Sequence, residues 1–252
     1  MKLKQSIRYQ IEDFFWPVIV YYAVVVVLHV AASLAWMFTP ATIHMSGGLS
    51  GFSSLFLFIC GLCSFHDNLP MHLQNGVSRK TLYTAWLAVT VAVSALMAIV
   101  DTVLATLIGL MNLPIWDYGS ANLFFTLFDL DHLSFGETVV NTLVSIPFSF
   151  VVLVFAMSLG YLMVVFFYRL PVKLRIVVGV CLGFLFFNST WGIRMLDEWV
   201  GYRISDFVAA YVWPVTDAIE ASPFLTMGCW LVASAVIAAV TWLILRRTQV
   251  RR

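Results

Sequence analysis

A polar loop between two long apolar segments carries the side chains best suited to binding or chemistry. It reads His66-Asp-Asn-Leu-Pro-Met-His-Leu-Gln-Asn-Gly-Val-Ser-Arg-Lys-Thr-Leu-Tyr. The spacing predicts a short helix that ends at Asn75-Gly76, because glycine readily takes the left-handed conformation of a helix C-cap. Ser78 then stands where it caps the next helix. An ordinary connection between two helices would have the same pattern. A functional loop and a simple connection therefore both remain open as interpretations.

Asp101 is the only acid that lies well inside an apolar segment. An ionisable group at membrane depth costs at least a few kcal/mol and is by default a functional candidate. We therefore treat Asp101 as a candidate for lining a pathway. The alternatives are a local contact with Thr102 or Thr106, or a position near the outer interface. His29 is expected to be a hydrogen-bonded interior residue rather than a proton relay.

Two further patterns have the residue types of a redox site or a metal site but lack the context that such a site requires. Cys60-Gly-Leu-Cys63 has the spacing of a redox motif, but it lies in an apolar helical segment without the strand context of such a site. His66, Asp67 and His72 have no fourth ligand nearby. We predict no metal site.

The elements that position these residues follow from the composition. The 252 residues are 62% hydrophobic and 11% charged, whereas a soluble domain is about 25% charged. Membrane-spanning chains form helices or closed barrels. Unbroken apolar runs such as 16–38 exclude the alternating strands of a barrel. The chain is predicted to be an all-α integral membrane protein.

The predicted layout is one domain over 1–252 with six transmembrane helices. An amphipathic helix over 3–15 is expected to lie in the interface before the first span. A re-entrant or interfacial outer segment, 193–222, precedes the last span. The spans are placed near 16–38, 47–65, 81–111, 138–167, 174–192 and 223–245. Gly47-x-x-x-Gly51 and Gly179-x-x-x-Gly183 are expected to allow close helix packing, within one subunit or between two.

The basic residues predict the orientation of the chain. Positive residues accumulate in cytoplasmic loops, so both termini are predicted to be cytoplasmic. Alternate flanks of the spans divide the basic residues unequally. One side of the membrane holds Lys2, Lys4, Arg8, Arg79, Lys80, Arg169, Lys173, Arg175, Arg246, Arg247, Arg251 and Arg252, and the other holds Arg194 and Arg203.

A family resemblance is carried by Gln74-Asn-Gly-Val-Ser-Arg-Lys-Thr-Leu-Tyr and the long apolar helix that follows. This run resembles the loop between the second and third spans of small bacterial ABC-2 type transporter permeases. The layout of the whole chain is similar to theirs as well. Outside the loop, the likeness is one of pattern rather than identity.

The resemblance implies a permease that exports a peptide or an amphipathic compound from a bacterial cell across its inner membrane. Its implied partners are the bilayer, a second permease copy or similar permease, and a separate ATP-binding subunit that would hold ATP and Mg; no nucleic acid is implied. The chain itself would hold no cofactor and no catalytic residue. The docking surface would include His66, Asp67, Met71, His72 and Gln74, and the turn into span three would comprise Asn75, Gly76, Val77, Ser78, Arg79 and Lys80.

Three rival functions remain open. An immunity protein that sequesters a bacteriocin without ATP predicts no dependence on a partner ATPase. A membrane-embedded enzyme predicts paired acids or histidines inside the spans. A secondary transporter predicts inverted halves with broken helices in matching positions, and the sequence shows neither.

Overall fold

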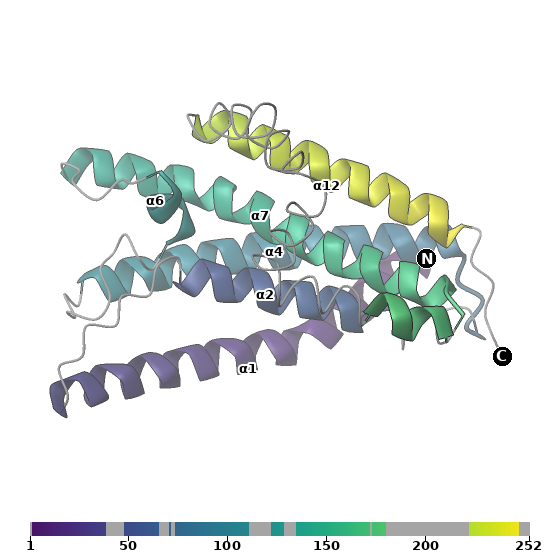
Figure 1. Cartoon of the computed structure of the whole chain (residues 1–252), viewed down its shortest axis with the longest axis horizontal. Coiled ribbons are helices and arrows are strands. Elements are labelled where there is room, and N and C mark those ends of the chain that lie inside the picture. The colour runs from purple at the N-terminus through teal and green to yellow at the C-terminus, as the bar shows by residue number, and fades with distance from the viewer. Residues whose placement is uncertain are drawn as a thin grey trace, which may run out of the picture.

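A computed structural model of the chain shows a bundle of long helices (Figure 1). The residues that it describes are 2–38, 48–65, 71, 74–110, 122–128, 135–171, 173–179 and 222–246. Their main elements, in chain order, are α1 (Lys2–Phe38), α2 (Gly48–Cys63), α4 (Arg79–Leu110), α6 (Leu123–Leu127), α7 (Phe135–Arg169) and α12 (Pro223–Leu245). A further helical stretch covers 173–179.

Four of these helices, α1, α4, α7 and α12, are long and apolar enough to cross a membrane. The chain is therefore a multi-pass helical membrane protein. Six spans are not confirmed. The second predicted span is α2, whose 16 residues extend for about 24 Å, less than the roughly 30 Å of hydrocarbon in a bilayer. Most of the fifth, 174–192, and the whole outer segment 193–222 lie outside the described residues.

The N-terminal segment is continuous with the first span, since α1 runs through Pro17 without interruption. Its inward face differs from the predicted apolar stripe. Ser6 and Gln10 are 3% and 1% exposed, whereas Leu3 and Ile11 are 44% and 40% exposed. Ser6 and Gln10 therefore face the bundle together with Phe14, and Ile7 packs against the same core, whereas Leu3 and Ile11 face outward. The location of 3–15 in the membrane interface stays a prediction.

The helices pack around α4 and α7, which contact each other at the centre of the bundle. Helix α1 packs against α4, and α12 packs against α7, so these two helices lie on opposite sides of the bundle (Figure 1). Helix α2 packs mainly against α7. Buried residues of α2 recur at helical spacing and form one stripe: Leu49, Ser53, Leu57 and Cys60.

A close backbone contact joins α2 and α7 at two glycines. A Cβ added to Gly61 would overlap the backbone oxygen of Met157, and one added to Gly160 would overlap that of Phe58. Gly61 lies inside the Cys-Gly-Leu-Cys run, so that run serves helix packing, and Cys60 and Cys63 are both free. The predicted packing glycines behave differently, because none of the described residues lies within 4 Å of the Cβ position of Gly51 or Gly179. Their motif partners Gly47 and Gly183 lie outside the described residues.

The charged residues separate along the bundle. Helix α1 begins at the end of the bundle where α2, α7 and α12 finish and α4 begins (Figure 1). The described basic residues gather at this end, which we call the basic end. They are Lys2, Lys4, Arg8, Arg79, Lys80, Arg169, Lys173, Arg175 and Arg246.

The short helix α6 lies at the opposite end and is fixed by an asparagine. The Asn122 side chain accepts from the Phe124 N–H at 3.0 Å and donates to Ser145 Oγ of α7 at 3.1 Å. The Leu123 N–H donates to Ser50 Oγ of α2 at 3.4 Å. Helix α6 is therefore bound to both neighbouring helices.

Candidate functional site

The turn before α4 has the geometry that its sequence predicts. Gly76 has φ of 67°, in the left-handed region where glycine is favoured. The Thr81 N–H donates to Ser78 Oγ at 3.2 Å, so Ser78 caps the first turn of α4. The Asn75 N–H donates to the Met71 carbonyl at 3.1 Å and closes one helical turn before the glycine. The loop therefore enters α4 through a defined backbone turn.

The side chains of this turn face outward. Gln74, Asn75, Ser78 and Lys80 are exposed, and Met71 is 39% exposed. Val77 and Arg79 are half-buried. Of the other residues assigned to docking, His66, Asp67 and His72 lie outside the described residues. The use of this surface for docking stays a prediction.

The first turns of α4 are bonded to α12. Arg79 Nη1 donates to the Arg246 carbonyl at 3.2 Å, at the C-cap of α12. One turn further along α4, Tyr83 Oη donates to the Ala238 carbonyl at 2.6 Å. Two hydrogen bonds therefore link the first turns of α4 to α12. Sequence analysis missed this connection, because nothing in the spacing pairs residues more than 150 positions apart.

Aromatic stacking strengthens the same contact. The Tyr83 ring stacks on Trp242 of α12 and on Trp86 of α4, with centroids 5.6 and 5.8 Å apart. Trp86 stacks on Tyr161 of α7 at 3.9 Å. Three helices thus share one run of stacked rings near the basic end.

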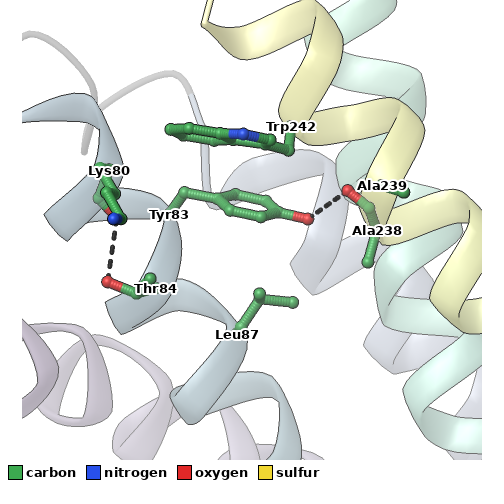
Figure 2. Close-up of a pocket in the computed structure, with 7 residues that line it drawn as sticks. All are labelled: Lys80, Tyr83, Thr84, Leu87, Ala238, Ala239 and Trp242. Carbon is green, nitrogen blue, oxygen red and sulfur yellow. Dashed lines mark hydrogen bonds between the residues drawn. The ribbon is translucent and has the colours of Figure 1, made fainter.

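A cavity of about 470 Å³ lies beside these rings (Figure 2). Figure 2 shows Trp242 lying over the Tyr83 ring, with the tyrosine hydroxyl directed at Ala238. Helix α4 contributes Lys80, Tyr83, Thr84 and Leu87 to the lining, and α12 contributes Ala238, Ala239 and Trp242.

Removing the Tyr83 hydroxyl separates its hydrogen bond from its stacking. We expect Tyr83→Phe to lower the free energy of unfolding by about 0.6 kcal/mol, the usual loss for a hydrogen bond between membrane helices. Tyr83→Ala also removes the ring and should cost about 3–5 kcal/mol. Unfolding in mixed micelles, followed by tryptophan fluorescence, measures both. Equal losses for the two variants would show that the stacked ring contributes nothing.

The second candidate site surrounds Asp101, which is 1% exposed. Tyr22 Oη donates to Asp101 Oδ1 at 2.8 Å and to the Met97 carbonyl at 3.2 Å. Tyr21 Oη and Ser53 Oγ lie 2.8 Å apart, and the two tyrosine rings meet edge to face with centroids 5.1 Å apart. The cluster therefore joins α1, α2 and α4.

Asp101 does not line an open space in this arrangement, because its side chain is enclosed. A pathway role for it stays a prediction. Thr102 and Thr106 donate to carbonyls of their own helix, at Ala98 and Thr102, rather than to the carboxyl. The partner is Tyr22, 79 positions earlier, and no sequence signal marks that pairing.

The Asp101 cluster lies far from the basic end. Asp101 is 22 residues beyond Arg79 in one continuous helix, which is about 33 Å. The carboxyl and the capped turn therefore lie near opposite ends of α4. A groove of about 510 Å³ opens between α1 and α2 beside the cluster. Its lining is mostly apolar: Tyr21, Val24, Val25, Leu28, His29, Leu49, Phe52, Leu55, Phe56 and Ile59.

No family model, curated protein or solved structure matches this chain. Within the described part of the chain, no three His, Cys, Asp or Glu side chains are grouped as metal ligands would be. The capped turn and the Asp101 cluster therefore have to be interpreted from their own geometry.

Proposed function

We propose that this chain is the permease subunit of an ABC-2 type transporter, with the loop before α4 as the element that couples it to a separate ATP-binding subunit. The observation that carries the proposal is the capped turn at Gly76 and Ser78, followed at once by bonds from Arg79 and Tyr83 to α12. A coupling loop has to transmit force without bending. This one enters α4 through a fixed turn and holds a second spanning helix.

The charge distribution indicates the side of the membrane on which the partner would bind. Positive residues accumulate on the cytoplasmic side of membrane proteins, where ATP is available. The capped turn lies at the basic end, together with the start of α1 and the end of α12. The basic end would therefore be cytoplasmic, in a bacterial inner membrane.

The proposed direction of transport and the proposed cargo are those implied by the resemblance of the loop to ABC-2 type permeases. The permease would act as two copies, or with a similar partner, and would export a peptide or an amphipathic compound. The apolar groove between α1 and α2 is consistent with a cargo that carries an apolar part. ATP and Mg would be bound by the partner subunit.

Site-directed cross-linking tests the docking surface. A photo-reactive amino acid is placed at exposed Gln74, and a matched control is placed at exposed Leu127 on α6, at the other end of the bundle. We expect position 74 to cross-link to the co-expressed ATP-binding subunit in membranes, and position 127 not to. The native pair should also co-purify.

Two results would contradict the proposal: failure of the pair to co-purify, or cross-linking at position 74 that is no stronger than at position 127. In either case the loop is a plain connection, and sequestration without ATP becomes the better interpretation.

A further inference from the structure

The hydrogen bonds of Tyr22 place a constraint on Asp101. A phenol hydroxyl carries one hydrogen and can also accept. Tyr22 Oη lies 2.8 Å from Asp101 Oδ1 and 3.2 Å from the Met97 carbonyl, so two acceptor oxygens compete for one hydrogen. The Met97 carbonyl can bring no hydrogen of its own. The carboxyl can, if it carries a proton.

The protonated carboxyl satisfies both contacts. Asp101 then donates its O–H to Tyr22 Oη, and Tyr22 donates its own hydrogen to the Met97 carbonyl. With a carboxylate, Tyr22 must divide one hydrogen between two acceptors. The geometry therefore accommodates one additional proton.

The surroundings of Asp101 also favour the neutral acid. A buried carboxylate is strongly disfavoured unless a cation or several donors compensate it. Among the residues that the structure describes, the titratable groups facing Asp101 are Tyr21 and Tyr22 of α1, and Ser53 of α2 is a second hydroxyl that bonds the carboxyl. These hydroxyls are neutral, and no Lys, Arg or His from the described parts of α1, α2, α4 or α7 pairs with Asp101.

We propose that Asp101 and Tyr22 form a proton-binding site that holds α1 against α4. The ligand is a proton, bound on the Asp101 carboxyl at the end of the bundle away from the basic residues. Loss of the proton leaves a buried negative charge at the α1–α4 contact and weakens that contact. The site does not depend on which partner binds the loop.

The test compares the full-length chain with Asp101→Asn in lipid nanodiscs over a range of pH. The amide of Asn can donate to Tyr22 as the neutral acid does, but it does not titrate. Where the folded state holds the proton and the unfolded state has lost it, the native chain becomes less stable as pH rises. The equilibrium constant for unfolding then increases tenfold per pH unit. The Asp101→Asn chain should lack this component.

Infrared spectroscopy provides a second measurement that does not need the Asn variant to fold. The native chain should show the C=O stretch of a buried carboxylic acid at neutral pH. Tyr22→Phe should shift that band, because it removes the hydrogen-bond partner of the acid. A native chain without such a band, or a band unchanged in Tyr22→Phe, overturns the proposal, as does equal pH dependence of the native and Asn chains.

Discussion

Gly76→Val is expected to uncouple the loop from α4, reducing partner-stimulated ATP hydrolysis roughly 5- to 150-fold. The backbone at Gly76 has φ of 67°, where a β-branched residue is strained by about 1–3 kcal/mol. That strain lowers the equilibrium constant for forming the capped turn by the stated factor. The prediction rests on the proposed function, and the measurement is ATP hydrolysis by the co-purified pair in lipid.

Gly76→Asn is the matched control for this experiment. Asparagine tolerates the left-handed conformation, so the turn should survive and stimulated hydrolysis should stay near the native level. The unfolding of both variants is measured alone, which separates loss of coupling from loss of folding. If folded Gly76→Val stimulates hydrolysis like the native chain, the turn is a connection without a coupling role.

Gly160→Ala is expected to force α2 and α7 apart and to lower the free energy of unfolding by about 1–3 kcal/mol or more. The added methyl would meet the backbone oxygen of Phe58, which cannot rotate away as a side chain can. Gly61→Ala should behave alike, because it meets the backbone of Met157 in the same contact. The double variant should lose less than the sum, since the helices are already separated.

Gly228→Ala provides the matched control on α12. Nothing lies within 4 Å of its Cβ position, so the substitution should be neutral or stabilise the helix by up to about 1 kcal/mol. Unfolding of all four variants in mixed micelles measures these differences. Losses at Gly61 and Gly160 no larger than at Gly228 would show that the α2–α7 contact is looser than described.

Local features of the fold could be predicted from the sequence. The last span, 223–245, coincides with α12, and the third and fourth predicted spans lie within α4 and α7 apart from one residue at 111. The turn at Gly76 and the cap at Ser78 were also predicted, because each depends on the conformational preference of one residue and its immediate neighbours. Apolar length and single-residue preferences are properties of short stretches of chain.

The inward faces of the helices could not be predicted in the same way. In a membrane the lipid is as apolar as the protein interior, so hydropathy does not identify the face that turns inward. Helix α1 accordingly buries Ser6 and Gln10 and exposes Leu3 and Ile11. The glycines with recognisable spacing lie in open space, while Gly61 and Gly160 form the contact.

The helical membrane class, the places of the long helices along the chain and the turn into α4 can all be predicted from the order of the residues. The folded bundle is needed to see which distant residues meet: Tyr22 with Asp101, Tyr83 with α12, and Gly61 with Gly160. Helix formation and capping depend on neighbours in sequence. Helix pairing instead depends on shape and on single hydrogen bonds between faces that hydropathy cannot tell apart.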